Sequence, residues 1–540
     1  MKKIFSFFLI FITLFTICGC RRVIKLKDDP ASVESVTKIG SYIKKANIDF
    51  NDVSFKKTLN ESLDKIYDAK DYNEIYTAFY AVIKKVNELV NKYYVAEVLV
   101  SYDQENSEYK EKYDILKDSY YEYQTFYNKA LVEISKNDEY INQFFDGYSE
   151  DDIEFEVNLA KKKIDDNYIT LNKEIDDLVS KANKIGIDFN NDEKDDELLE
   201  IMLEFINKNK QMAELLGFDS YVEYADLERN RSYLQSDVND YIKYTKQYIV
   251  PLMNEDEEYI DVRKYFNTLT YQQQNYFREF SYSSVFDKDY YTLDLLKDYA
   301  KNMGGAYFTA FAKFLNNGNY IFANEENSLD SAYTQGTVTY FGPNYQDCTT
   351  VAHEFGHYYS FTNAYLNTKS LDLMEFYSQA NEYLFTSYLQ QHSGKNVKDV
   401  YDVRIKDNLD SAARNIVVAS AMREFEQKIY SETLTTKDDI KDIWNTINSN
   451  NYKGYLRDYW KAEIRYDLYY LSYGTSVTGA IGLYNLSKTD YKGAKNKYVK
   501  AVNNSNIDDD ISEVLINAGL YSPFNEQVFK EIEKLLKEEW

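Results

Sequence analysis

Helical spacing of apolar residues dominates the N-terminal part of the chain. From about Ser32 to Lys210, apolar positions recur at intervals of three and four residues, and Lys, Asp, Glu and Asn fill the positions between them. This spacing predicts amphipathic helices that bury one face. The polar stretch from Asn190 to Glu197 interrupts the pattern, as a solvated loop or helix start does. We therefore predict a helical N-terminal region over residues 20–205 and a second region over residues 206–540.

The pattern changes between residues 324 and 347. Residues 337–341 are β-forming, and a turn-forming Gly-Pro-Asn follows them at 342–344. Asp347 is then a good N-cap for another helix. The apolar face of that helix comprises Val351, Phe355 and Tyr358. The rest of the chain is again mostly helical, so we predict a mainly α fold with a small β element directly before this helix.

This helix carries two of the three histidines in the chain. His353 and His357 lie four residues apart, and Glu354 directly follows the first. Residues four apart share a helix face, so both imidazoles can reach one tetrahedral zinc ion. Glu354 is rotated by about 100° from His353, which leaves it available to take a proton from the attacking water and pass it to the leaving amine. With so few histidines, at most roughly 0.003 such matches are expected by chance. The motif predicts a peptidase with one zinc per chain.

A catalytic zinc needs a third protein ligand and an open position. Glu375 and Glu382 lie on the next helical segment, seven residues apart and on nearly the same face. Their spacing alone does not choose between them. Asn363 stands where another zinc-peptidase pattern places a third histidine, and Ser360 replaces the glycine of that pattern. That other class is excluded.

The run His-Glu-Phe-Gly-His at 353–357 resembles the signature of the thimet oligopeptidase and oligoendopeptidase F group of metallopeptidases. Residues 213–221 and 347–352 also resemble that family, so the likeness spans about 213–484. The family's third ligand lies 25 residues after the second histidine, which implies Glu382 (382 − 357 = 25) and leaves Glu375 to support the ligands without touching the metal. The resemblance also implies a two-lobed helical body with a deep central channel that admits short peptides.

The same family carries tyrosines on a later glycine-containing segment, where they donate hydrogen bonds to the tetrahedral oxyanion. Tyr466, Tyr470 and Tyr473 have the matching offsets of zero, four and seven. In a chain with 55 tyrosines, core packing is the alternative explanation of this cluster. Many relatives place a histidine shortly before these tyrosines, but residues 460–463 contain none here. Lys461 is the candidate replacement for the missing donor.

Net charge and the N-terminus narrow the possible partners and location. The net charge of −26 has the wrong sign for binding phosphate backbones, so we expect no nucleic-acid partner. The apolar run from Ile4 to Cys18 is shorter than the about 20 residues of a membrane span, which favours a signal peptide over residues 1–19. The sequence ending at Cys20 resembles a bacterial lipobox. We expect Cys20 to carry a lipid anchor on the outer face of a bacterial membrane, with secretion as the alternative, and Cys348 to remain a free thiol.

Together these features predict a zinc-dependent endopeptidase that hydrolyses short peptides, with Glu354 as general base and then acid. The alternative is an exported lipoprotein that binds peptides without cleaving them. Only the missing histidine and the membrane anchor favour that alternative.

Overall fold

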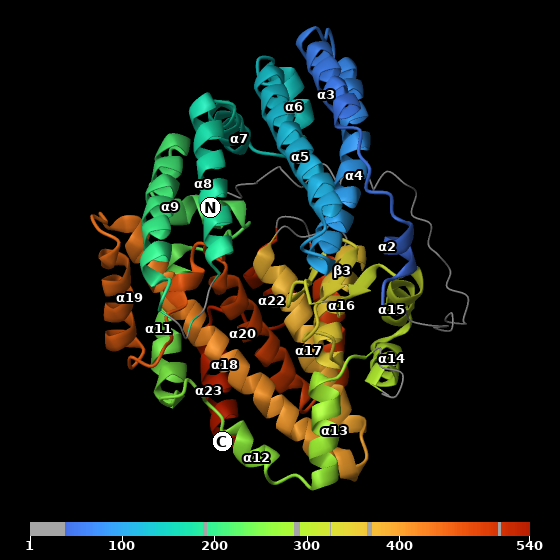
Figure 1. Ribbon diagram of the computed structural model, residues 1–540, viewed down its shortest axis with the longest axis vertical. Coiled ribbons are helices and arrows are strands. Elements are labelled where there is room, and N and C mark those ends of the chain that lie inside the picture. The colour runs from blue at the N-terminus through green and yellow to red at the C-terminus, as the bar shows by residue number, and fades with distance from the viewer. Residues whose placement is uncertain are drawn as a thin grey trace. The chain divides into compact units, whose positions relative to one another are not determined.

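The computed structural model describes residues 38–186, 189, 192–285, 292–324, 326–363, 370–505 and 509–539. These residues form a predominantly helical fold with one small three-stranded sheet (Figure 1), which confirms the predicted fold class. Within the described ranges, no helix combines the length and the apolar character that crossing a membrane requires. Cys20 and the predicted signal peptide lie outside them, so the lipid anchor stays a prediction.

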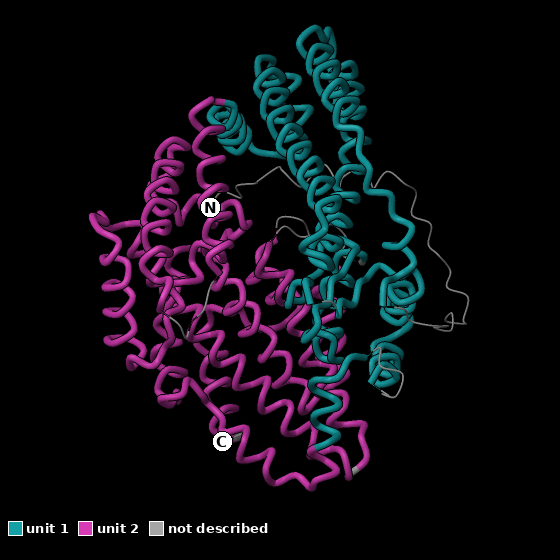
Figure 2. Tube along the Cα trace, viewed as in Figure 1, with its two compact units in different colours: residues 1–164, 275–367 teal, residues 165–274, 368–540 magenta. Residues whose placement is uncertain are grey.

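The chain divides into two compact units, and each is built from two separate stretches of sequence (Figure 2). Unit 1 comprises Met1–Ile164 and Asn275–Asn367, and unit 2 comprises Asp165–Gln274 and Thr368–Trp540. The division proposed at residue 205 differs from this one, since that residue lies inside helix α9 (Asp195–Leu216). A chain that leaves one unit and later returns to it cannot be divided by a single boundary.

Long helices form the first stretch of unit 1. They are α2 (Ser41–Lys45), α3 (Asp52–Tyr67), α4 (Tyr72–Tyr102), α5 (Ser107–Ile134), α6 (Asp138–Phe144) and α7 (Glu150–Lys163). Side-chain oxygens of Asn51, Asp71 and Asn106 cap the first turns of α3, α4 and α5 by accepting backbone N–H groups. These three helices pack against one another through buried apolar stripes, as their spacing predicts.

The second stretch of unit 1 builds the sheet and the helix with the histidine motif. Its elements are α14 (Thr292–Met303), α15 (Gly305–Asn317), β1 (Tyr320–Phe322), β2 (Ala332–Gln335), β3 (Val338–Phe341) and α16 (Cys348–Asn363). The strand order is β1-β3-β2; β3 runs parallel to β1 and antiparallel to β2. Gly336 turns the β2–β3 hairpin with a φ of 57°, a conformation that favours glycine. This hairpin confirms the predicted β element.

Unit 2 begins with a helical segment and continues after the motif helix. The first stretch holds α8 (Asp166–Ile185), α9, α10 (Tyr221–Glu228), α11 (Gln235–Tyr244), the π-helix η1 (Thr245–Ile249), the 3-10 turn η2 (Val250–Leu252) and α12 (Val262–Phe266). Helix α13 (Tyr271–Tyr282) leads back into unit 1. The second stretch holds α17 (Leu371–His392), α18 (Lys395–Ser431), α19 (Asp438–Asn451), the 3-10 turn η3 (Tyr459–Ala462), α20 (Tyr470–Ser487), α21 (Tyr491–Asn504), α22 (Ile511–Ala518) and α23 (Glu526–Glu539).

Helices α17, α18 and α20 pack against one another and form the centre of unit 2 (Figure 1). Two glycines of α20 permit this close packing. A Cβ added at Gly474 would lie 2.4 Å from the Cβ of Ala419 on α18. A Cβ added at Gly479 would lie 3.2 Å from the Phe376 ring on α17. Glycine therefore lets α20 approach both neighbours, at a helix-propensity cost of about 1 kcal/mol per residue.

Candidate active site

The motif helix α16 is fixed at its start by the predicted N-cap. Asp347 Oδ1 accepts the backbone N–H of Thr349 at 2.9 Å and that of Thr350 at 3.2 Å. The Thr350 hydroxyl also donates to Asp347 Oδ2 at 2.6 Å. These bonds satisfy donors that every helix N-terminus leaves unpaired, and a carboxylate there complements the helix dipole. Helix α16 is thereby anchored at its N-terminus, about two turns before His353.

Aromatic rings pack against the face of α16 that lies opposite the two histidines. Phe355 lies 1% exposed, with its ring 5.1 Å from that of Tyr307, 5.0 Å from Phe311 and 5.7 Å from Phe314. The pairs with Tyr307 and Phe311 are edge-to-face, and such pairs each add about 0.5–1.5 kcal/mol beyond the burial of apolar area. The packed face fixes the rotation of the helix, so the opposite face carries the two histidines.

Unit 1 brings His353, His357 and Glu354 together on this helix. Both histidines are half-buried, and their rings lie 5.2 Å apart between centroids. Glu354 is 4% exposed, and its Oε2 accepts the Thr334 hydroxyl at 2.7 Å. Thr334 stands on β2, and its hydroxyl is 3.0 Å from that of Thr339 on β3. The hairpin therefore fixes the direction of the Glu354 carboxylate, a contact that the sequence did not reveal.

The two acidic candidates on α17 have different surroundings within unit 2. Glu375 is 5% exposed, and its Oε1 accepts the Tyr469 hydroxyl while the Ser378 hydroxyl lies 3.4 Å from its Oε2. Glu382 is half-buried two helical turns further along, and the Thr386 hydroxyl donates to its backbone oxygen at 3.1 Å. Glu375 is thus the acid that lies within the tyrosine cluster.

The structure adds a fourth tyrosine, Tyr469, to the three that the sequence predicts as oxyanion donors; their role stays a prediction. Tyr469, which the offsets did not select, donates to Glu375, and its ring lies 4.8 Å from that of Tyr473. Tyr470 packs edge-on against Tyr466 at 6.2 Å. Tyr466 itself is 40% exposed. The spacing of Tyr469 and Tyr473, one helical turn apart, is a signal that could have indicated this pair.

Electrostatics keep the Tyr469 phenol protonated. Burial raises its pKa well above the ordinary value near 10, and the charge of Glu375 and the neighbouring Tyr473 raise it further. The phenol is therefore a hydrogen-bond donor at neutral pH, with no charge of its own. Burial likewise raises the pKa of Tyr470. Both tyrosines can donate to an acceptor that carries negative charge.

Lys461, the candidate replacement for the missing donor, and His392, the third histidine of the chain, lie elsewhere in unit 2. Lys461 is 1% exposed at its side chain, and its Nζ lies 2.7 Å from Asp195 and 2.9 Å from Asp192. These carboxylates occupy the ammonium group, so it is not a free donor that replaces the missing histidine. His392 is exposed in the last turn of α17 and stacks on Tyr388 at 4.4 Å, as expected of a surface histidine.

Cys348 is the free cysteine in the described part of the chain, and it is fully buried at the start of α16. Its thiol lies 3.5 Å from the Phe280 carbonyl oxygen, within the range of a weak S–H donor. Cys348 is thus a free thiol, as predicted, and it packs in the interior at the start of α16.

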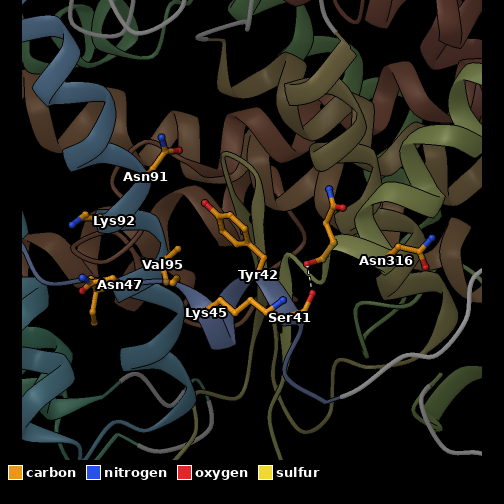
Figure 3. A pocket seen from close by; sticks show the side chains of 11 residues that line it. Ser41, Tyr42, Lys45, Asn47, Asn91, Lys92, Val95 and Asn316 are labelled. Carbon is orange, nitrogen blue, oxygen red and sulfur yellow. Dashed lines mark hydrogen bonds between the residues drawn. The ribbon is translucent and has the colours of Figure 1, made fainter. Parts of the chain in front are cut away.

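A pocket of about 540 Å³ lies in unit 1, away from the motif helix (Figure 3). Asn and Lys side chains from α2, α4 and the end of α15 line it, among them Lys45, Asn91 and Asn316. The Ser41 hydroxyl donates to the Asn317 carbonyl at its edge at 2.8 Å. No candidate site residue lines this pocket, so we give it no part in the proposed chemistry.

Comparison with known proteins identifies the fold. No family model and no curated protein matches the sequence. Among solved structures, PZ peptidase A with an inhibitor is similar with a TM-score of 0.69 and 14% identity, over 92% of this chain and 99% of that one. A putative oligoendopeptidase F from Bacillus anthracis str. Ames is similar with a TM-score of 0.66 and 15% identity, over 93% and 98%.

A putative peptidase from Chlamydophila abortus has a TM-score of 0.61 and 14% identity, over 95% of this chain and 100% of that one. The chain therefore has the two-domain helical fold of the oligoendopeptidase F structures, as the motif resemblance implied. Fold alone does not determine activity, which depends on the residues of the site.

Proposed function

We propose that this protein is a zinc-dependent peptidase that cleaves short peptides. The observation that carries the proposal is the arrangement on α16. Two half-buried imidazoles share one helix face, and between them in sequence a buried glutamate is directed by a hydroxyl from the neighbouring hairpin. The similar solved structures are named as peptidases, which supports the proposal of peptidase activity.

The donor set on α16 fits zinc. Imidazole nitrogens are among the preferred zinc ligands in proteins, and a catalytic site uses three protein ligands with one open position. His353 and His357 would supply two of these ligands. Zinc bound there would lower the pKa of a coordinated water and polarise a substrate carbonyl.

The third ligand would come from α17. The family resemblance implies Glu382. The packing of unit 2 favours Glu375, which is nearly buried and held by Tyr469. A metal ligand is usually oriented by a hydrogen bond from a neighbouring group, and Tyr469 supplies such a bond to Glu375. We therefore propose Glu375 as the third ligand. Glu382 is the alternative, and mutation of each glutamate distinguishes the two.

The protein's own groups would then handle protons and charge. Glu354 would accept a proton from the attacking water and deliver it to the leaving amine, with Thr334 holding the carboxylate in one orientation. Phenol hydroxyls of the 466–473 segment would donate to the developing oxyanion. A phenol placed in advance needs little rearrangement as the charge forms.

The test is peptide cleavage by purified protein reconstituted with zinc, measured with a quenched fluorescent peptide. We expect about one zinc per chain and loss of cleavage on chelation. Glu354→Gln is expected to retain zinc and to lower kcat by about 10²–10⁴-fold, since it removes the base but no ligand. Glu61→Gln, an exposed change on α3, is the matched control and should cleave normally.

Two results would overturn the proposal. Protein that takes up no transition metal cannot use the α16 histidines in this way. Protein that binds zinc and peptide but cleaves nothing would instead be a peptide-binding protein.

A further inference from the structure

The Arg231 side chain is fully buried in unit 2, where its guanidinium joins three parts of the fold. Its Nη1 donates to Asp226 Oδ1 on α10 at 2.8 Å. Its Nη2 donates to the Leu468 carbonyl and to the Ser472 hydroxyl, both at 2.8 Å. Its Nε donates to Asp372 Oδ1, in the first turn of α17, at 3.3 Å. A planar guanidinium can serve several acceptors in this way, whereas a lysine ammonium cannot match the same fork.

One of these partners is a strained turn. Leu468 has a φ of 49°, the left-handed conformation that non-glycine residues rarely adopt and that costs on the order of 1 kcal/mol or more. Arg231 binds its carbonyl oxygen, and Arg229 donates to the preceding carbonyl, that of Asp467. Two arginines from the segment after α10 therefore hold consecutive peptide groups of this turn. The residue that directly follows the turn is Tyr469.

The other partner fixes the start of α17. Asp372 is fully buried and, besides Arg231, accepts hydroxyls from Ser472, Thr475 and Tyr233. Its carboxylate thus binds α20 to the first turn of α17. Glu375 follows Asp372 by three residues, on the next turn of the same helix. Arg231 therefore contacts both the turn that precedes Tyr469 and the first turn of α17, which precedes Glu375. Tyr469 and Glu375 are the two residues that the hydroxyl–carboxylate hydrogen bond joins.

We propose that Arg231 is a positioning residue for the proposed peptidase. By holding the Leu468 turn and Asp372 at once, it sets the Tyr469 hydroxyl against the Glu375 carboxylate and keeps Tyr473 beside it. Arg231 acts through Tyr469 and does not touch substrate. The inference rests on the proposed function only for its catalytic consequence; the holding of the turn is independent of it.

Arg423 supplies the matched control. Its side chain is also fully buried, and it pairs with Asp226 and, at 3.6 Å, with Glu426. These partners stand on α10 and α18, so Arg423 shares the acid of Arg231 but binds neither the turn nor α17. Replacing either buried guanidinium with an ammonium group disturbs a charge network, with a comparable expected loss of stability. Only the loss of Arg231 should loosen the segment that carries Tyr469.

The experiment compares Arg231→Lys, Arg423→Lys, Tyr469→Phe and the double variant Arg231→Lys/Tyr469→Phe in the full chain. We expect Arg231→Lys to lower kcat by about 10-fold or more with KM within about twofold, because the change affects the position of a hydrogen-bond donor and not a group that binds the peptide. Arg423→Lys should stay within about threefold of the parent kcat. The double variant should be no slower than Tyr469→Phe, since residues acting through one another are not additive.

A second readout does not depend on cleavage. Amide hydrogen exchange across residues 466–473 should become about 10-fold faster in Arg231→Lys and stay unchanged in Arg423→Lys. If Arg231→Lys does not fold, Ser472→Ala replaces it, because that change removes one acceptor of Arg231 and one donor to Asp372 without burying a new charge. It should lower kcat in the same direction and speed exchange in the same segment.

Equal effects of Arg231→Lys and Arg423→Lys on kcat and on exchange would overturn the proposal, since both arginines would then be only structural. Multiplicative effects in the double variant would overturn the route through Tyr469. Parent protein that cleaves no peptide with zinc would overturn the proposed function. In that case the exchange comparison still decides whether Arg231 holds the turn.

Discussion

The two regions that carry the proposed site have different interiors. Behind α16 in unit 1, the motif helix packs on aromatic rings, with Phe355 in contact with Tyr307, Phe311 and Phe314. Around α17 and α20 in unit 2, the packing includes buried charges. The side chains of Arg231, Asp372 and Arg423 are fully buried there.

The difference follows from what each region has to orient. Two histidines one helical turn apart already face the same way, so apolar packing need only fix the rotation of a single helix. Tyr469 lies in the turn directly before α20 and Glu375 lies on α17, so their hydroxyl–carboxylate contact depends on the relative positions of these two segments. Dispersion contacts have little directional preference, whereas hydrogen bonds to charged groups are strongly directional. The charged network gives unit 2 that directionality, at the desolvation cost of burying ions.

The largest expected effect tests which acid of α17 belongs to the site. Glu375→Ala should weaken zinc retention by about 100-fold or more and abolish most cleavage, because it removes a proposed ligand. Glu382→Ala should change zinc affinity by no more than about 10-fold, the low end for a residue that only supports ligands. Zinc titration with a competing chelator measures both variants.

The family resemblance implies the reverse order. If Glu382→Ala loses the metal and Glu375→Ala keeps it, the charged network does not orient a ligand. The contrast between the two regions would then concern packing alone. Glu513→Ala, in the first turn of α22, is the control for general effects of removing a carboxylate from unit 2.

The part of the site that the sequence could predict is the part whose residues are close together in the chain. His353, His357 and Glu354 lie within five residues of one another, so helix geometry alone places them, and Asp347 caps their helix as its position predicts. Thr334 could not be selected, because its contact with Glu354 depends on how the hairpin packs against α16. Local spacing predicts local geometry only.

The same limit applies more strongly in unit 2. Arg231 and Asp372 are 141 residues apart in sequence, and nothing in their local surroundings distinguishes them from surface charges. The offsets zero, four and seven selected Tyr466, Tyr470 and Tyr473, whereas the tyrosine that donates to Glu375 is Tyr469, which directly follows Leu468 in its left-handed conformation. Helical spacing does not predict a residue in that conformation, so the contact of Tyr469 could not be derived from those offsets.

A smaller effect sharpens the contrast among the tyrosines. Tyr469→Phe should lower kcat by about 10–10²-fold with zinc content unchanged, because the ring and its buried area stay while the donor to Glu375 is lost. Tyr271→Phe is the matched control, since Tyr271 is 78% exposed at the start of α13 and has no part in the proposed site, and its kcat should stay within about twofold. Steady-state kinetics on one fluorescent peptide separate the two. A kcat for Tyr469→Phe within about twofold of the parent would mean that the Tyr469 hydroxyl does not support the site.

The smallest expected effect concerns the pH dependence that the buried charges of unit 2 create. Glu426 on α18 is fully buried, and neither carboxylate oxygen accepts a hydrogen bond from the described residues. Burial raises its pKa from about 4.5 to about 7; Arg423 and Arg231 oppose this rise, while Asp467 adds to it. Between these pH values the unfolded chain loses a proton that the folded protein keeps. Glu426 therefore stabilises the fold fully below about pH 4.5, and this contribution is lost as the pH rises to about 7.

Glu426→Gln removes this titration, because an amide has the same shape and stays neutral. Between pH 5 and pH 8, the melting temperature of the variant should fall by about 2–4 °C less than that of the parent. At pH 8 the variant should therefore have the higher melting temperature. Glu432→Gln, at the exposed end of the same helix, is the control and should follow the parent across the range. Differential scanning calorimetry at closely spaced pH values gives both curves. Parallel curves for Glu426→Gln and the parent would mean that Glu426 is ionised in the fold throughout, with Arg423 and Arg231 outweighing its burial.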